Sequence, residues 1–357
     1  MKVGLPKETM TGEGRVALIP GACQKLISSG HSVFVQTSAG DISGYSDDEY
    51  REVGAEIAES AEKLYGSAEL IVKVKQPLEH DLHYLREQHT LFSYLHLAAY
   101  PELVKKLCEL GLTAIPFESV KDDQGRLPLL LPMSAIAGRI SVIRGSSLLF
   151  SNRGGRGILL GGPDGTDLGK VVILGAGVAG SHAVSVAVAL GANVHVFDLD
   201  ENRLASLRKK YPTIFTHIST AERVDEICVD ADLVIGAVLI SGRRAPVVLK
   251  ESVIKKMYQG SVIIDIAIDQ GGCVEGIRAT DSDELFYTRH GVLHSAVPNM
   301  PAAVPRTSSQ SLSGSIYPYV ERIANGALSD DDVLIAATAI KAGEIVDDVL
   351  KEEIEGS

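Results

Sequence analysis

Tryptophan is absent from this sequence, and aromatic residues of all kinds make up only 5% of its 357 positions. The hydrophobic share of 45% must therefore come mainly from valine, isoleucine, leucine and alanine. Aliphatic cores of this kind are typical of α/β proteins, whose parallel strands are buried on both faces. The same share excludes a chain that is disordered throughout, and the length predicts about two domains.

Cysteine is scarce, and no C-x-x-C pair occurs. The four cysteines, Cys23, Cys108, Cys228 and Cys273, lie far apart, so we expect free thiols in a reducing compartment. The N-terminus has no apolar run of signal-peptide length. The apolar stretch 171–197 contains four glycines and divides more naturally into strand, turn, helix and strand than into a membrane span. We therefore expect a cytoplasmic protein without a membrane partner.

Basic residues are outnumbered by acidic ones. Lys and Arg total 34 against 46 for Asp and Glu, which gives a formal net charge of −12. Such a chain repels a phosphate backbone, so nucleic acid is not an expected partner. A metal site is also not expected. His80 and His83 lie three residues apart, as two metal ligands can, but no further ligand motif is evident. The function is therefore sought among small-molecule sites.

Apolar runs alternate with amphipathic stretches along the chain. In the first third the patterns predict strands over 32–36, 70–75 and 114–117, and helices over 47–53 and 102–111. After residue 169 the alternation is clearer, with strands predicted over 171–174, 193–198, 233–236 and 262–265. Alternating strands and helices indicate mainly parallel sheets with right-handed crossovers, and hence the α/β class.

Two further stretches organise the chain. A helical segment over 134–150 lies between Gly- and Pro-rich segments and is interpreted as the bridge between two domains. After Thr307, helical periodicity over 312–326 and 330–353 predicts helices without a strand, packed back on the first domain. Within this region the aspartates of 330–332 are typical of a helix start.

A G-x-G-x-x-G motif spans residues 175–180. The β-rich run 171–174 precedes it, an apolar helical stretch follows, and Asp198 ends the next predicted strand. In such a motif the first glycine permits a tight turn, the second lets the backbone approach a pyrophosphate and the third lets the helix pack on the strand. The helix N-terminus then meets the phosphates. Asp198 can accept hydrogen bonds from the ribose and would repel a 2′-phosphate, so NAD is predicted over NADP.

A nicotinamide cofactor implies a substrate that donates a hydride, and three residues of the first third are candidates for binding it. Arg15 lies in a loop before an apolar run, and Lys75 ends a predicted strand, where α/β proteins place binding groups. His96 lies in an apolar setting. From the residues alone, a surface role for Arg15 and a core role for His96 stay open.

The chain resembles the NAD-dependent L-alanine dehydrogenases, a family that shares its fold with the α subunit of proton-translocating transhydrogenase. The Tyr-Leu-His-Leu sequence around His96 and the Ile-Asp-Gln-Gly-Gly sequence around Asp269 are typical of the dehydrogenases. The matching blocks extend over about residues 1–320 and are, in order, 4–8, 15–18, 72–75, 94–98, 129–134, 137–139, 154–161, 232–239, 265–272 and 299–307.

The resemblance implies two Rossmann-like, doubly wound parallel-sheet domains with a cleft between them. Residues 1–130 with 308–357 would form the substrate domain, and 131–307 the NAD-binding domain. It implies that Arg15 and Lys75 bind the substrate, and that His96 and Asp269 are the catalytic acid/base groups. Together with the glycines of the motif, the cofactor contacts would be Ser134, Gly175, Gly177, Val178, Ala179, Gly180, Asp198, Arg203, Ser219, Val238, Leu239, Ile266, Ala267, Ile268, Asp269, Arg278, Val297, Pro298, Asn299 and Met300.

The implied reaction is the reversible oxidative deamination of L-alanine to pyruvate and ammonium, catalysed by a homo-oligomer, which is usually a hexamer in this family. The residue types suit that chemistry. An arginine fork binds a carboxylate in two places, a lysine polarises a carbonyl oxygen, and histidine exchanges protons near neutral pH. The apolar tail over 333–340 is expected to supply contact surface between subunits.

The sequence departs from the family pattern in two places. Residues 294–298 read His-Ser-Ala-Val-Pro where the family has His-Tyr-Cys-Val-Ala, and an apolar run over 334–340 replaces a Gly- and Asn-rich tail. Two alternatives therefore stay open. One is a related reductive aminase or imine reductase acting on another 2-oxo acid, and the other is a non-catalytic NAD-binding module of the transhydrogenase type.

Overall fold

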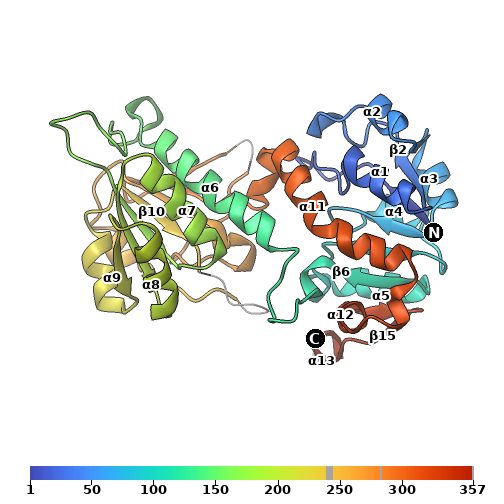
Figure 1. The fold of residues 1–357 in the computed structure, drawn as a ribbon. Helices are drawn as coiled ribbons and strands as arrows, with labels where there is room; N and C mark the ends of the chain where they lie inside the picture. The colour runs from blue at the N-terminus through green and yellow to red at the C-terminus, as the bar shows by residue number, and fades with distance from the viewer. Residues whose placement is uncertain (239–243, 282–283, 356–357) are drawn as a thin grey trace. The chain divides into compact units, whose positions relative to one another are not determined.

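The chain divides into two compact units (Figure 1), and the computed structural model describes residues 1–238, 244–281 and 284–355. Unit 1 consists of residues 1–133 and 302–357, and unit 2 of residues 134–301. Each unit has its own sheet with helices packed against it, so the predicted α/β class with two mainly parallel sheets is confirmed. Which unit binds substrate and which binds NAD stays a prediction at this point.

Unit 1 is built on an eight-stranded sheet with the order β15-β14-β6-β5-β4-β1-β2-β3. Six of its strands are parallel neighbours, namely β1 (Lys2–Leu5), β2 (Ser32–Gln36), β3 (Glu56–Ala58), β4 (Leu70–Val72), β5 (Thr90–Ser93) and β6 (Thr113–Pro116). Because parallel strands all end at the same edge, the segments that follow β1, β4, β5 and β6 lie side by side. Three of the predicted substrate and catalytic residues fall in those segments.

The C-terminal segment contradicts one prediction, because it contains strands. β14 (Ile340–Lys341) and β15 (Glu344–Ile345) form an antiparallel hairpin at the edge of the unit 1 sheet, and Ile340 pairs with Ala114 of β6. Each strand is only two residues long. Two residues are too few to display the alternation of polar and apolar residues that predicts a strand, so only the helical periodicity of the flanking segments is detected.

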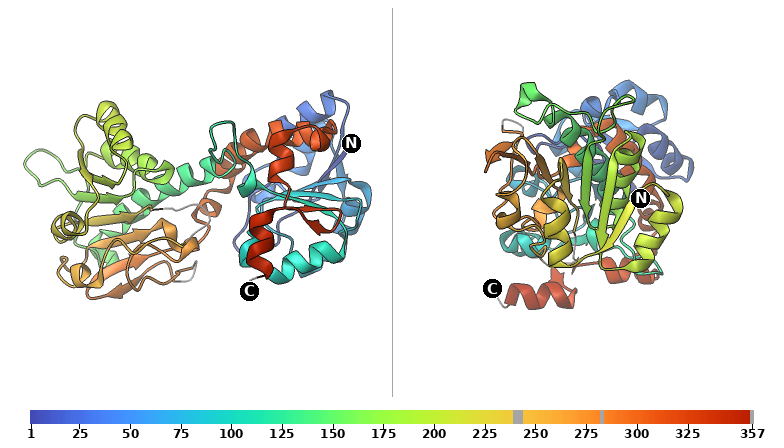
Figure 2. Two further views of the ribbon diagram at one scale, coloured as in Figure 1. Left: turned by 90° about the horizontal axis from the view of Figure 1, so that it is seen from below. Right: turned by 90° about the vertical axis from the view of Figure 1, so that its left-hand side faces the viewer.

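The helices of unit 1 come from both ends of the chain. They are α1 (Pro20–Ser28), α2 (Asp47–Glu52), α3 (Ala61–Ser67), α4 (Glu79–Leu82), α5 (Pro101–Glu109), α11 (Pro305–Ala324), α12 (Asp332–Ala337) and α13 (Asp348–Glu355). Asp331 caps α12 by accepting the N–H groups of Val333 and Leu334, which confirms the predicted helix start. At the end of the chain, α13, drawn in dark red beside the mark C in the left view of Figure 2, packs beside the short η2 helix (Leu97–Ala99).

Helix α11 joins the two ends of unit 1 by hydrogen bonds. The Ser309 hydroxyl accepts the N–H of Val16 at 2.9 Å, and the Ser313 hydroxyl accepts the N–H of Ile19 at 3.1 Å. Both serines are buried. Buried backbone N–H groups need partners, so α11 supplies acceptors that the N-terminal segment itself does not provide here.

The apolar run that begins in α12 belongs to the core of unit 1. Leu334 and Ile340 are fully buried, and Ala337 is 1% exposed. Ile335 is exposed. Leu334, Ala337 and Ile340 are therefore covered within the chain, and the expectation of a contact surface between subunits stays a prediction for the exposed part of the run.

Unit 2 is built on a seven-stranded sheet with the order β12-β13-β11-β10-β7-β8-β9. The strands are β7 (Lys170–Leu174), β8 (Asn193–Asp198), β9 (Phe215–Ile218), β10 (Leu233–Gly236), β11 (Val262–Asp265), β12 (Tyr287–Arg289) and β13 (Val292–Ser295). Strand β12 is antiparallel to β13 and the others are parallel. The chain winds outward from β7 in both directions, so the carboxyl end of β7 is the switch point at which such sheets bind ligands.

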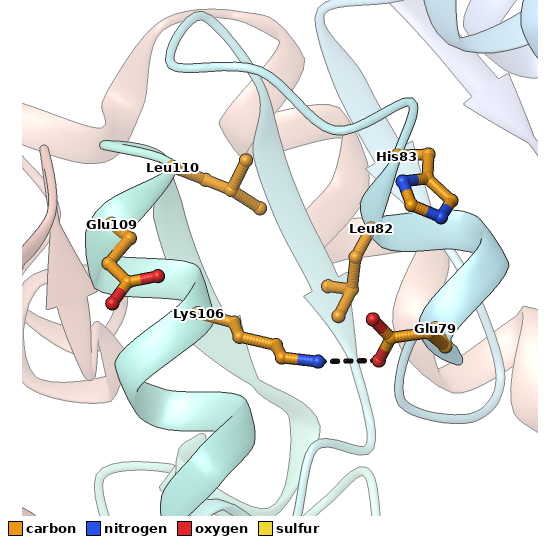
Figure 3. A pocket seen from close by; sticks show the side chains of 6 residues that line it. All are labelled: Glu79, Leu82, His83, Lys106, Glu109 and Leu110. Atoms are coloured by element: carbon orange, nitrogen blue, oxygen red, sulfur yellow. Dashed lines mark hydrogen bonds and ion pairs between the residues drawn. The ribbon is translucent and has the colours of Figure 1, made fainter.

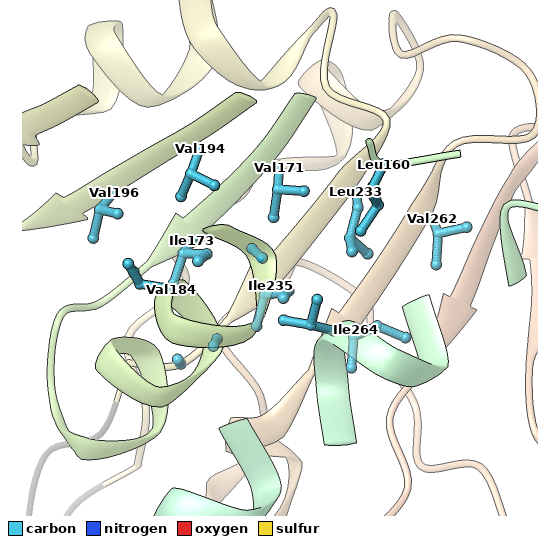
Figure 4. Close-up of a cluster of buried hydrophobic side chains, with 14 of the residues drawn as sticks. Leu160, Val171, Ile173, Val184, Val194, Val196, Leu233, Ile235, Val262 and Ile264 are labelled. Atoms are coloured by element: carbon cyan, nitrogen blue, oxygen red, sulfur yellow. The ribbon is translucent and has the colours of Figure 1, made fainter. Parts of the chain in front are cut away.

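The core of unit 2 explains why its strands were predictable. The side chains of Val171, Ile173, Ile235 and Ile264 are fully buried between the sheet and its helices (Figure 4). Continuous aliphatic runs of this kind mark parallel strands covered on both faces. The helices are α6 (Leu131–Leu148), α7 (Val178–Ala189), α8 (Glu201–Lys210), α9 (Ala221–Cys228) and α10 (Glu251–Ile254). The helix predicted over 134–150 is α6.

In the part of the chain that the structure describes, every helix is either too short or too polar to cross a membrane. All four cysteines carry free thiols, and three of them, Cys23, Cys228 and Cys273, are buried. Burial raises the pKa of the Cys228 thiol to about 12. These thiols therefore act as small apolar core groups at neutral pH.

Candidate active site

The glycine-rich loop of unit 2 turns from β7 into α7 at the switch point of the sheet. Gly175 has a φ of 105°, which favours glycine, and a Cβ there would lie 2.6 Å from the carbonyl oxygen of Ala237. A Cβ on Gly180 would overlap the carbonyl oxygen of Gly175. By contrast, a Cβ on Gly177 would meet no atom within 4 Å. The protein's own packing thus requires the first and third glycines, whereas the second faces open space.

Asp198 ties this loop to the end of β8. One carboxylate oxygen accepts the N–H of Ala176 at 2.6 Å, and the other accepts the N–H of Asp200 at 2.9 Å. The guanidinium of Arg203, from α8, lies 3.8 Å from the same carboxylate. An ionised carboxylate has about four acceptor positions, so Asp198 can still accept ribose hydroxyls beside the loop. Its place next to the glycine-rich loop is the one that dinucleotide recognition requires.

Most other predicted cofactor residues follow the carboxyl ends of the unit 2 strands. Ser219 follows β9, Val238 follows β10, residues 266–269 lie in η5 (Ile266–Gln270) after β11, and residues 297–300 follow β13. Val178 and Ala179 begin α7, and Ser134 lies in α6. Arg278 lies in the loop before β12, where Glu284 accepts from both of its terminal nitrogens. Leu239 lies outside the described residues.

The loop that carries Asp269 is organised around a buried aspartate. Asp265, at the end of β11, is fully buried and accepts the N–H groups of Ala267 at 2.8 Å, Cys273 at 2.8 Å and Val274 at 3.1 Å. Burial raises the pKa of Asp265, and these backbone bonds oppose the rise. Asp269 itself is exposed. Sequence reasoning missed Asp265, although its place at a strand end just before the predicted Asp269 was a usable signal.

Arg15, in unit 1, is a buried residue rather than a surface one. Its side chain is 1% exposed, and it is paired with Glu13, whose side chain is fully buried. The two carboxylate oxygens of Glu13 accept from Nε at 2.7 Å and from Nη2 at 2.5 Å. The remaining terminal nitrogen, Nη1, points to the sulfur of Met133 at 3.0 Å. Glu13 therefore fixes the plane of the guanidinium.

Lys75 follows β4 and is positioned by a buried ionic cluster that we call the Lys73 cluster, formed by Glu8, Lys73 and Asp81. Lys73 is 1% exposed, and its ammonium lies 3.5 Å from the Glu8 carboxylate and 3.4 Å from the Asp81 carboxylate. Glu8 also accepts the N–H groups of Val74 at 2.7 Å and Lys75 at 3.4 Å. Burial raises the pKa of Glu8, and the charge of Lys73 opposes the rise. The signal for this cluster was a lysine within the apolar run that predicts a strand over 70–75.

His96 follows β5 and has a left-handed backbone with φ 48° and ψ 42°. Its side chain is 45% exposed, so it is not a core histidine. The imidazole stacks on the ring of Tyr94 with a centroid distance of 6.3 Å and an interplanar angle of 13°. Tyr94 is buried, and its hydroxyl donates to the carbonyl of Leu129 at 2.5 Å. A fixed aromatic platform therefore presents the exposed imidazole.

The three unit 1 residues lie beyond neighbouring strands, since β1, β4 and β5 are adjacent in the sheet. Arg15 also lies near Tyr94, the residue on which the His96 ring stacks. Burial raises the pKa of Tyr94, which supports the His96 ring, and the nearby Arg15 charge opposes that rise. The structure thus gathers Arg15, Lys75 and His96 at one edge of unit 1. Asp269 lies in unit 2.

A shallow hollow elsewhere on unit 1 contains none of these residues (Figure 3). It is lined by side chains of α4, α5 and their C-terminal ends, namely Glu79, Leu82, His83, Lys106, Glu109 and Leu110. The ammonium of Lys106 contacts the Glu79 carboxylate at 2.5 Å across it. Among the described residues, no group of three or more histidine, cysteine or acidic side chains is arranged to hold a metal ion.

The fold and the site define a two-unit α/β protein in which one unit has a dinucleotide-binding fingerprint at its switch point. The chain matches the family described as alanine dehydrogenase/PNT, over residues 4–137 for the N-terminal domain and 141–348 for the C-terminal domain. It belongs to that family, as the resemblance predicted.

Curated relatives and solved structures agree with this membership. An alanine dehydrogenase of Bacillus subtilis is 46% identical over 96% of this chain and 90% of its own length. One from Mycolicibacterium smegmatis is 40% identical over 99% of this chain and 97% of its own length. A solved L-alanine dehydrogenase has a TM-score of 0.97 and 43% identity, covering 100% of this chain and 99% of that one. A Sinorhizobium meliloti transhydrogenase structure has a TM-score of 0.85 and 25% identity, covering 98% and 100%.

Proposed function

We propose that this chain catalyses the reversible NAD-dependent oxidative deamination of L-alanine. L-Alanine, water and NAD⁺ give pyruvate, ammonium, NADH and a proton. The observation that carries the proposal is the gathering of Arg15, Lys75 and His96 at one edge of the unit 1 sheet. A binding module would have no need for that set, and alanine dehydrogenases of this length are 40–46% identical to the chain.

The residues of unit 2 fit a dinucleotide. The open space at Gly177 lets a diphosphate approach the backbone, and the first turn of α7 offers N–H groups and the positive end of the helix dipole. Asp198 accepts the ribose hydroxyls and repels the 2′-phosphate of NADP. When bound there, NAD would supply the hydride acceptor for the reaction at Cα of the amino acid.

The residues of unit 1 hold the substrate. Pyruvate and alanine each carry a carboxylate, and the Arg15 guanidinium, whose plane Glu13 fixes, pairs with it. Lys75 places a positive charge at the oxygen of the 2-oxo group, which polarises the carbonyl before ammonia adds. The backbone bond from Lys75 to Glu8 fixes the start of that side chain.

His96 and Asp269 move the protons. In deamination, a base removes a proton from the attacking water and an acid returns one to the departing ammonia as the carbinolamine collapses. Histidine suits this work because it changes charge near neutral pH. Asp269 supplies a second acid/base group from unit 2. A homo-oligomer is part of the proposal, and light scattering that gives a monomer at micromolar concentration would contradict it.

The test is a panel of amino acids with NAD⁺, with NADH formation followed by absorbance. We expect L-alanine to give the highest kcat/KM, and pyruvate with ammonium to consume NADH in reverse. A clear preference for another amino acid would favour a reductive aminase or imine reductase of different substrate choice. NAD binding by calorimetry without oxidation of any amino acid would instead favour a non-catalytic module.

A further inference from the structure

Glu118 reaches the segment that carries His96 from the neighbouring strand. Strands β5 and β6 are parallel, and Ser93 pairs with Pro116 at their carboxyl ends. The short η3 helix (Phe117–Ser119) follows β6, so Glu118 lies beside the segment that follows β5. Its carboxylate accepts the N–H of His96 through Oε1 and the N–H of Leu95 at 3.2 and 3.3 Å.

These bonds hold an unusual backbone. His96 is one of five described residues other than glycine that have a positive φ, and such a conformation persists only where the surroundings fix it. Two consecutive N–H groups that point to one side form a concave anion site, and here a side-chain carboxylate fills it. Glu118 is therefore the group that satisfies the strained turn.

The carboxylate of the same residue also lies beside the imidazole ring. Nδ1 of His96 lies 3.9 Å from Oε1 of Glu118. A carboxylate on the Nδ1 side favours a proton on Nδ1 and leaves Nε2 for the substrate. Phe117, adjacent to Glu118, packs edge-on against Tyr94 at 4.9 Å, and Tyr94 in turn supports the imidazole. Two adjacent residues of η3 thus contact the turn directly and the ring through Tyr94.

We propose that Glu118 is a positioning residue for His96. It holds residues 95 and 96 in the left-handed turn and sets the imidazole so that Nε2 is the nitrogen that exchanges protons. This inference rests on the proposed function. It predicts that Glu118 contributes to turnover only through His96, and contributes little to the binding of substrate or NAD.

The kinetic test compares Glu118→Gln and Glu118→Ala with the wild type. Glutamine keeps an acceptor oxygen for the backbone N–H groups but loses the charge, whereas alanine loses both. We expect kcat to fall about 10-fold for glutamine and about 10²-fold for alanine, with KM for L-alanine and NAD within about 3-fold. Glu109→Gln, an exposed carboxylate on α5, controls for the change in net charge and is expected to leave kcat unchanged.

A double-mutant cycle separates positioning from a merely structural role. In a His96→Ala background, Glu118→Ala is expected to reduce the residual kcat by less than about 3-fold, because the group it positions is gone. A further loss of about 10²-fold, or a wild-type kcat for Glu118→Ala alone, would overturn the proposal.

Hydrogen exchange tests the geometry without relying on activity. Glu118→Ala is expected to speed amide exchange in the peptide that contains Leu95 and His96, with little change in the strands of unit 2. Unchanged exchange there would overturn the positioning role. If the wild type oxidises no amino acid, the proposed function fails, and the exchange measurement still decides whether Glu118 holds the turn.

Discussion

Replacing Lys73 by methionine would test the Lys73 cluster that lies under Lys75. Methionine fills a similar volume but removes the charge, and it leaves the buried carboxylates of Glu8 and Asp81 without their shared cation. Breaking a buried ion pair by removing one partner costs about 3–5 kcal/mol, because an uncompensated charge stays buried. In a unit of this size that loss lowers Tm by about 10 °C.

The assay is thermal unfolding followed by circular dichroism, with Lys63→Met as the matched control. Lys63 pairs with Glu59 on the surface, and the two side chains are 63% and 79% exposed. Exposed pairs contribute little, so the control is expected to leave Tm within about 1 °C of the wild type. Equal decreases in Tm for the two substitutions would refute the argument that burial makes the Lys73 cluster important for stability.

The loss of stability in Lys73→Met is also expected to depend on pH. The pKa of Glu8 is raised in the native state because burial outweighs the attraction of Lys73. A raised pKa means that the folded protein binds this proton more readily than the unfolded chain, so the contribution of Glu8 to stability is present at low pH and is lost as pH rises. Removing the Lys73 charge raises that pKa further. The Tm deficit of Lys73→Met relative to the wild type should therefore become smaller as the pH is lowered from neutral, and a deficit that grows on acidification would contradict this reasoning.

Three further predictions concern the cofactor and the catalytic groups. Gly177→Ala is expected to keep the wild-type Tm, because φ at this position is −66° and a Cβ would meet no atom within 4 Å. The same substitution is expected to weaken NAD binding, measured by calorimetry, about 10-fold. An unchanged affinity would show that the diphosphate binds elsewhere. Asp198→Ala is expected to narrow the preference for NADH over NADPH in kcat/KM, and comparable efficiency with both cofactors in the wild type would contradict the role of Asp198. His96→Ala and Asp269→Ala are each expected to lose about 10²-fold or more in kcat while remaining folded, with NAD binding kept in His96→Ala; near-normal turnover in a folded His96→Ala enzyme would show that the base lies elsewhere.

The parts of the fold that the sequence predicts best are those whose signal is local. Strands such as 171–174 and 262–265 are short apolar runs with polar or glycine ends, and they are found within a residue of β7 and β11. The two-residue strands β14 and β15 depend on pairing with the edge of β6, and the local sequence of 340–345 gives no sign of that pairing.

The same division applies to the candidate site. Gly175 and Asp198 were predicted because their spacing around a strand and a helix is fixed by the motif itself. Glu118, Asp265 and Glu8 were missed because each carboxylate accepts backbone N–H groups, and for Glu118 and Glu8 those groups belong to the segment that follows a different strand. Such roles depend on which strands are neighbours, and a single sequence does not state that order.

The way α11 completes unit 1 also sets an order of events during synthesis. In the sequence, unit 2 comes between the two segments of unit 1, so a growing chain contains all of unit 2 before residue 302 has been made. Until then the N–H groups of Val16 and Ile19 lack the hydroxyls of Ser309 and Ser313 as acceptors. Strand β6 likewise lacks its pairing with β14. Domains generally fold as units as the chain emerges. The middle of this protein can therefore mature first, and the edge that carries Arg15, Lys75 and His96 is completed only when the last part of the chain returns to it.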